Sequence, residues 1–236
     1  RYESRAYRRF DLITMVSDED RKMASSFLSG DGRRVQVIPN GVDCEHNRPG
    51  LAQPQPDSLI FNGALTYRAN YDAMRYFLAE IYPLIRQQLP DVSLTITGST
   101  SGVDLAGLPL AESVHLSGYV DDVRPLVAGA WAGVVPLRQG GGTRLKILEA
   151  MALGTPVIAT TKGAEGLAAT PERDLLIADE PAEFAAQAVR LARDPGLRAR
   201  LAHNARRLVE ERYDWAAIGA RFVDLVEAVA QERGGP

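Results

Sequence analysis

Three consecutive glycines stand directly before a short helical pattern that carries two cations and a carboxylate. The glycines are 140–142, the cations are Arg144 and Lys146, and the carboxylate is Glu149. Glycine lets a backbone approach a ligand closely, and the free N–H groups at a helix start favour an anion such as phosphate. A carboxylate one turn further along can accept hydrogen bonds from sugar hydroxyls. The combination indicates a site for a nucleoside diphosphate.

A second interpretation of the same stretch stays open. Glycine-rich turns before helices are common, and Glu149 could pair with Lys146, three residues earlier on one helix. The stretch would then be an ordinary turn followed by a surface ion pair.

The surrounding chain alternates between apolar, strand-like runs and helical patterns, which favours an α/β fold with a doubly wound, mostly parallel, Rossmann-like sheet. Ligands of such sheets bind beyond the carboxyl ends of the strands, so Gly63, Gly98, Tyr119 and Gly140 should share one rim. Asn70 is expected to cap a helix over 71–88, and Leu145, Leu148, Met151 and Ala152 should form the apolar face of the helix that starts at Thr143. The predicted strands are 11–16, 35–38, 59–62, 92–97, 114–116, 132–137, 157–160 and 175–177, and the other predicted helices are 18–28, 121–128, 181–193, 195–211 and 215–231.

Composition excludes several classes of function. The 236 residues carry a net charge of −3, which gives no support for a nucleic-acid partner. A single cysteine, Cys44, rules out an internal disulfide and any multi-cysteine metal site, and the histidines have no ligand spacing, so we expect no metal and no cofactor. No apolar run approaches the roughly 18–20 residues that span a membrane, and no signal peptide is visible.

Five motifs occur in order along the chain, at Val37–Asp43, Leu59–Gly63, Leu94–Gly98, Val114–Val120 and Leu148–Ala159. Together they resemble the family-4 glycosyltransferases of the GT-B fold. The resemblance runs from Asp11 to the last helix and implies a retaining, two-domain enzyme of glycan biosynthesis with its active site between the domains. It implies that 1–40 is the tail of the N-terminal acceptor-binding domain, 41–57 the interdomain linker, 58–214 the nucleotide-sugar-binding domain, and 215–236 a C-terminal helix returning towards the N-terminal domain.

The family's functional residues are only partly present. Glu149 matches the second signature glutamate, which binds the ribose hydroxyls in the family, but Gly141 stands where the first glutamate should be. Ala64 and Ala69 stand where the family has an arginine and a lysine. We therefore expect Arg68, Arg144 and Lys146 to neutralise the diphosphate instead. The residues expected to act in catalysis are Arg68, Lys146 and Glu149, and those expected to bind the donor are Gly63, Tyr119, Val120, Gly140, Gly141, Gly142, Thr143, Arg144 and Glu149.

The resemblance implies a cytoplasmic glycosyltransferase that moves a sugar from a nucleoside-diphosphate sugar, with UDP or GDP as the expected carrier. The acceptor would be a glycan, a lipid-linked sugar or a small molecule. The arginine-rich helix 195–211 leaves peripheral contact with the inner membrane face open, although its interspersed acids favour a solvated surface. A non-catalytic nucleotide-binding or scaffolding relative remains an alternative because of Gly141. A dinucleotide-dependent oxidoreductase is disfavoured, because no G-x-G-x-x-G follows the first strand.

Overall fold

The computed structural model describes residues 6–7, 9–28 and 35–233, and its main body is a six-stranded sheet. All neighbouring strands run parallel, in the order β5-β4-β3-β6-β7-β8. The doubly wound parallel sheet predicted from the sequence is therefore confirmed. Its strands are β3 (Ser58–Asn62), β4 (Ser93–Thr97), β5 (Val114–Gly118), β6 (Ala132–Val135), β7 (Val157–Ala159) and β8 (Leu176–Ile177).

The strand order reverses between β3 and β6. From β3 the chain moves outwards through β4 to β5, then returns to the other side of β3 and continues through β6, β7 and β8. Strands β3 and β6 are direct neighbours, with Leu59 opposite Ala132. Ligands of doubly wound sheets bind at such a reversal, outside the carboxyl ends of the strands. The loops that follow Asn62 and Val135 meet at that point.

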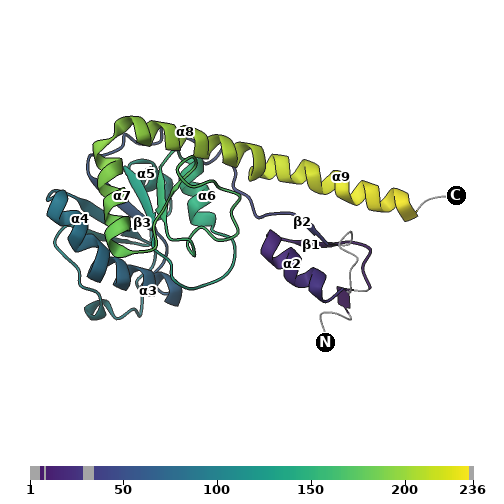
Figure 1. Cartoon of the computed structure of the whole chain (residues 1–236), viewed down its shortest axis with the longest axis horizontal. Helices are drawn as coiled ribbons and strands as arrows, with labels where there is room; N and C mark the ends of the chain where they lie inside the picture. The colour runs from purple at the N-terminus through teal and green to yellow at the C-terminus, as the bar shows by residue number, and fades with distance from the viewer. Residues whose placement is uncertain (1–5, 8, 29–34, 234–236) are drawn as a thin grey trace.

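Helices cover both faces of the sheet, as Figure 1 shows. One face packs against the continuous stretch α3 (Arg68–Tyr76), η2 (Phe77–Ile81) and α4 (Tyr82–Gln88), and against α7 (Pro181–Arg193). The opposite face packs against α5 (Arg124–Ala128), α6 (Leu145–Ala152) and α8 (Pro195–Arg212). Each fully buried large apolar side chain in these two layers stabilises the fold by about 1.5–3 kcal/mol. The short helix η3 (Leu105–Gly107) lies in the loop between β4 and β5.

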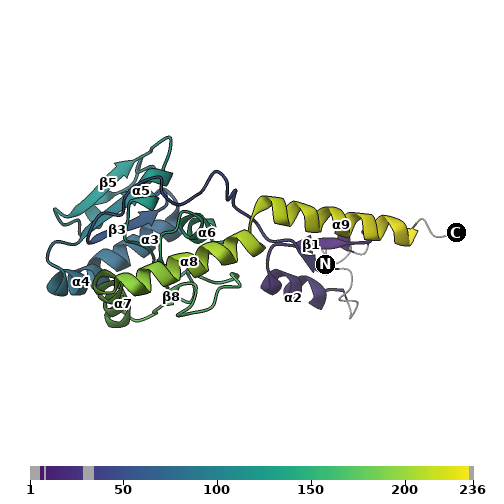
Figure 2. The ribbon, with the colours of Figure 1, turned by 90° about the horizontal axis from the view of Figure 1, so that it is seen from above.

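A smaller unit lies to one side of this body, under the last helix (Figures 1 and 2). It consists of the parallel pair β1 (Ile13–Met15) and β2 (Val35–Val37) with α2 (Asp18–Ser26) between them, while α9 (Trp215–Arg233) projects from the end of α8. Ser17 caps α2 by accepting a hydrogen bond from the backbone N–H of Asp20.

The chain between the small unit and the sheet is tied to the turn between α8 and α9. The N–H of Val42 donates to the carbonyl of Tyr213 at 2.8 Å, and the N–H of Trp215 donates to the carbonyl of Val42 at 3.2 Å. Two backbone hydrogen bonds therefore fix residues 38–57, the junction between β2 and β3, against the turn between α8 and α9.

The predicted cap at Asn70 is wrong. The helix begins at Arg68, and its N-cap residue, Tyr67, makes no side-chain cap bond. The Asn70 side chain is buried inside the first turn, where its amide nitrogen donates to the carbonyl of Ala64 at 2.9 Å. Burial directs this side chain into the structure instead of back to the helix start.

The predicted apolar face of α6 is wrong at one position and incomplete at another. Leu145 is 43% exposed, because the helix begins there and its first turn lies at the rim of the sheet. Ile147, which was not predicted, is fully buried beside Leu148 and Met151. The short helix is therefore covered on more than one side, unlike the single-faced surface helix assumed from the periodicity.

Candidate functional site

The glycine loop lies between β6 and α6, at the reversal of the sheet. Gly140 and Gly142 have φ angles of +105° and +83°, which side chains with a Cβ rarely adopt. A Cβ at Gly140 would lie 3.3 Å from the Cβ of Ala69, so the loop packs closely against the start of α3. A Cβ at Gly141 or Gly142 would meet no atom within 4 Å. The loop is held on one side and open on the other.

Lys146 turns from the first turn of α6 towards the end of β3. Its Nζ donates to Oδ1 of Asn70 at 2.8 Å and lies 4.2 Å from the centre of the Phe61 ring. A Cβ at Gly63 would lie only 2.7 Å from this Nζ, so the missing side chain at Gly63 makes room for the ammonium. Burial lowers the pKa of Lys146 to about 8; the Arg144 charge acts in the same direction and Glu149 opposes it.

The ammonium of Lys146 thus occupies the space beside residues 63 and 70, which adjoin Ala64 and Ala69 in the chain. Those two alanines are the positions at which the resemblance implied an arginine and a lysine. The sequence-predicted residues Gly63 and Lys146 are brought together here, with the glycine loop close by through Ala69. A cation from α6 therefore lies beside the residues that adjoin these two alanines.

Glu149 lies one turn further along α6 and faces the end of β3. Its Oε2 accepts a hydrogen bond of 3.0 Å from Nδ2 of Asn62, whose Oδ1 in turn accepts one of 2.9 Å from the hydroxyl of Thr97. Burial raises the pKa of Glu149, while the Lys146 charge and the Asn62 hydrogen bond lower it in part. Glu149 therefore does not form the simple surface pair with Lys146 that the sequence left open.

A cavity of about 240 Å³ opens in front of Glu149 and Asn62. Its other walls come from the loop after β5, including Asp121 and Asp122, and from the junction at His46 and Asn47. Tyr119 and Val120, which the sequence predicted to bind the donor, precede Asp121 in the same loop, and Tyr119 is 77% exposed. The structure therefore brings Glu149 and the loop after β5 to one side of the rim.

The sequence predicted that the Arg144 charge faces the diphosphate, but the side chain is buried in the glycine loop. Its side chain is 6% exposed, and its guanidinium donates to the carbonyls of Gly140, Gly141 and Lys162 and contacts Glu165. A buried cation needs such partners, because leaving it unpaired away from water is costly. The Arg144 side chain therefore holds backbone carbonyls of the loop instead of neutralising a phosphate, as had been expected.

Arg68 and Glu149 line different cavities. It is exposed at the first position of α3 and lines a shallow cavity with Tyr71 and residues 101–104. The hydroxyl of Tyr71 donates to the carbonyl of Asp104 at 2.9 Å, which ties the β4–β5 loop to α3. The residues on both sides of Arg68, Tyr67 and Ala69, lie close to Gly140, but Arg68 is not part of the cavity in front of Glu149.

Three asparagines in or beside the site were not predicted as site residues. Asn62 orients Glu149, Asn70 holds Lys146, and Nδ2 of Asn40 donates to the hydroxyl of Thr143 at 2.8 Å. The signal for Asn62 was present, because a polar residue at the end of a buried strand points to the ligand-binding rim. No local signal identified Asn40, which lies 103 positions from its partner.

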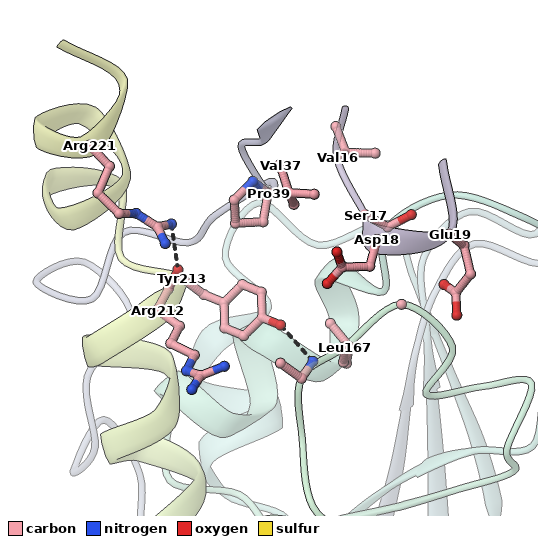
Figure 3. Close-up of a pocket in the computed structure, with 12 residues that line it drawn as sticks. Val16, Ser17, Asp18, Glu19, Val37, Pro39, Leu167, Arg212, Tyr213 and Arg221 are labelled. Atoms are coloured by element: carbon pink, nitrogen blue, oxygen red, sulfur yellow. Dashed lines mark hydrogen bonds between the residues drawn. The ribbon is translucent and has the colours of Figure 1, made fainter. Parts of the chain in front are cut away.

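A larger cavity of about 380 Å³ lies elsewhere, between the small unit and the α8–α9 turn (Figure 3). Asp18 and Glu19 line one side, and Arg212 and Arg221 line the other. Tyr213 stands between them, and its hydroxyl accepts a hydrogen bond from the N–H of Ala168. This cavity contains none of the residues predicted from the sequence to bind a ligand.

The described ranges hold neither a metal-binding cluster of side chains nor a membrane-spanning helix. No group of three or more His, Cys, Asp or Glu side chains there could hold a metal ion. No helix in that part of the chain has the length and apolar character needed to cross a membrane.

The parallel sheet with a glycine loop at its reversal defines an α/β protein of the Rossmann-like class. The chain belongs to the family of group 1 glycosyl transferases, whose family model matches residues 56–194. This confirms the resemblance inferred from the five sequence motifs. The solved structure of the Anabaena protein HepE in complex with UDP has the same GT-B fold, with a TM-score of 0.76 at 17% identity over 92% of this chain and 64% of that one.

Two curated relatives are mannosyltransferases. The chain is 25% identical over 243 residues to the GDP-mannose-dependent monoacylated alpha-(1-6)-phosphatidylinositol monomannoside mannosyltransferase of Corynebacterium glutamicum, covering 92% of this chain and 62% of that protein. It is 30% identical over 227 residues to the phosphatidyl-myo-inositol mannosyltransferase of Mycobacterium leprae, covering 91% and 58%. The chain thus spans about three fifths of the length of these relatives.

Proposed function

We propose that this chain binds a nucleoside-diphosphate sugar and supplies the donor site of a glycosyltransferase. The observation that carries the proposal is the position of Lys146, whose ammonium lies beside Gly63 and Asn70 at the reversal of the sheet. The open glycine loop and the Glu149 carboxylate lie at the same rim. A cation, free backbone donors and a carboxylate are the groups that a diphosphate attached to a ribose requires.

Each group has a distinct role in this proposal. The N–H groups of Gly141 and Gly142 and the ammonium of Lys146 bind the diphosphate, while Glu149 accepts hydrogen bonds from the ribose hydroxyls. Negative charge grows on the departing diphosphate as the bond to the sugar breaks, and donors already oriented towards it stabilise that charge without reorganising. Arg68, exposed at the start of α3, adds a second cation.

The carrier nucleotide is proposed to be UDP or GDP. HepE was solved with UDP, and the Corynebacterium relative is named for its dependence on GDP-mannose. The acceptor is proposed to be a glycan, a lipid-linked sugar or a small molecule, since both mannosyltransferases above are named for phosphatidylinositol acceptors. Peripheral membrane contact, if the acceptor is a lipid, belongs to this proposal.

The alternative is a relative that binds the nucleotide without transferring a sugar, since Gly141 replaces the first signature glutamate. The position of Lys146 argues against it. A buried ammonium costs free energy, and its placement beside the end of β3 and the start of α3 fits a site that still binds a diphosphate.

Calorimetric titration of the chain with UDP, GDP and ADP tests the proposal. We expect saturable binding of one nucleotide, and a loss of about tenfold in Glu149→Ala, because the variant loses hydrogen bonds that involve a charged group. Glu183→Ala, which removes an exposed carboxylate from α7, serves as the matched control and should bind normally. Failure of all three nucleotides to bind would contradict the proposal, as would equal binding by both variants.

A further inference from the structure

Arg144 lies inside the glycine loop and contacts two consecutive carbonyl groups. Its Nη2 donates to the carbonyl of Gly140 and its Nη1 to that of Gly141, both at 3.2 Å. The same guanidinium donates to the carbonyl of Lys162 at 2.9 Å and lies 3.3 Å from Oε2 of Glu165, which also pairs with the Lys162 side chain. One buried side chain therefore joins the glycine loop to the loop after β7.

These two hydrogen bonds fix the direction of two N–H groups. The described peptide bonds are all trans, and in a trans peptide the C=O and the N–H point in opposite directions. Because the carbonyls of Gly140 and Gly141 point towards Arg144, the N–H groups of Gly141 and Gly142 point away from it. Within the described part of the chain neither N–H donates to another residue, and the space beside both glycines is open.

We propose that Arg144 is a positioning residue that turns the glycine loop into a preformed anion cradle. It draws two carbonyls inwards, so that two adjacent N–H groups face the diphosphate of the donor, and it does so without contacting the diphosphate itself. The inference rests on the proposed function, because it assigns the cradle to that site. Glu165 and Lys162 hold the guanidinium from the other side.

The fork of the guanidinium explains why an arginine serves here. Arginine presents several N–H donors in one rigid plane, whereas lysine carries a single ammonium on a flexible chain. A guanidinium can therefore hold both glycine carbonyls and the carbonyl of Lys162 at once. Lysine at this position keeps the charge but loses the fixed geometry, so it separates the effect of charge from that of loop orientation.

The test compares a nucleoside diphosphate with its own nucleoside, which lacks the phosphates, by NMR titration. The variants are Arg144→Met and Arg144→Lys, and Arg75→Met, from the exposed side of α3, is the control. We expect Arg144→Met to weaken diphosphate binding by about tenfold, because two hydrogen bonds of ordinary strength lose their orientation. Nucleoside binding should change by less than about twofold, since its contacts lie away from the loop. Arg144→Lys should fall between the wild type and Arg144→Met.

Other outcomes overturn the inference. Equal weakening of nucleoside and diphosphate in Arg144→Met would mean that the side chain only supports the fold, and unchanged diphosphate binding would mean that the cradle forms without it. If Arg144→Met does not fold, Arg144→Lys decides, because wild-type diphosphate affinity in that variant would show that charge alone suffices. Absence of diphosphate binding by the wild-type protein would overturn the proposed function itself.

Discussion

The amide of Asn40 donates a hydrogen bond of 2.8 Å to the hydroxyl of Thr143, across 103 positions of the chain. Asn40 belongs to the junction that precedes the sheet, and Thr143 is the residue that follows the three glycines. The glycine loop is therefore held from outside by the junction and from inside by Arg144.

This bond predicts coupling between the junction and the donor site. Asn40→Ala and Thr143→Val should each weaken nucleoside-diphosphate binding, and the double variant should be no worse than the poorer single one. A hydrogen bond of this kind contributes about 0.5–1.5 kcal/mol, or a factor of about 2–10 in affinity. A double-mutant cycle measured by calorimetry provides the check. If the losses of binding free energy in the two single variants simply add in the double variant, the hydrogen bond does not act on the loop.

Replacement of Lys146 should weaken the diphosphate site more than any other single loss of charge. We expect Lys146→Met to lose about 10–100-fold in affinity for the diphosphate, because hydrogen bonds to charged groups contribute about 1.5–3 kcal/mol. Lys22→Met removes the same charge from an exposed position on α2 and should bind normally. Equal affinities of these two variants would remove Lys146 from the site.

The lowered pKa of Lys146, about 8, predicts pH-dependent binding. Affinity for the diphosphate should fall as the pH rises from 7 to 9, because the ammonium loses its proton while a phosphate, with its second pKa near about 6, stays fully charged. In Lys146→Met the same titrations should show little change over this range. A wild-type affinity that stays constant to pH 9 would count against an ammonium at the site.

The same pKa has a consequence for stability without ligand. Between about pH 8 and the ordinary lysine value of 10.5 the unfolded chain holds more protons at Lys146 than the folded chain does. The contribution of this group to the free energy of unfolding therefore rises with pH in that window. The free energy of unfolding of Lys146→Met should lack this rise. Chemical denaturation of both proteins at pH 8 and pH 10 measures the difference.

Asn62 should act on the site through Glu149. Asn62→Ala removes the hydrogen bond that lowers the pKa of Glu149, so that pKa should rise further. Nucleotide affinity should fall by about 2–10-fold and be lost at a higher pH on acidification than in the wild type. Asn62→Asp should be worse, because two carboxylates would then face each other. Titrations between pH 5 and 7 give the profile, and an unshifted profile would exclude the positioning role.

The sheet and the glycine loop were predictable because their signals are local. The apolar runs 59–62 and 92–97 are each followed directly by a glycine, and these glycines placed the strand ends within about two residues of those observed. The importance of Glu149 was also visible, since its distance along the helix from the glycines depends only on helical geometry.

The directions of Lys146 and Arg144 were not predictable from the same patterns. Both were assigned to the diphosphate from their charge, yet one side chain turns towards Gly63 and the other into the carbonyls of its own loop. The direction of Lys146 depends on the missing Cβ at Gly63 and on Asn70, residues from other elements. The direction of Arg144 depends on the loop after β7, through Lys162 and Glu165. Such contacts arise only when the sheet is assembled.

We propose that a nucleoside diphosphate binds at the reversal of the sheet, between the glycine loop and Glu149. A crystal structure of the chain with the nucleotide that binds most tightly tests it most directly. We predict diphosphate oxygens within hydrogen-bonding distance of the N–H groups of Gly141 and Gly142 and of Nζ of Lys146, with the ribose on Glu149. A nucleotide found instead between Asp18 and Arg212, in the cavity of Figure 3, would contradict the account.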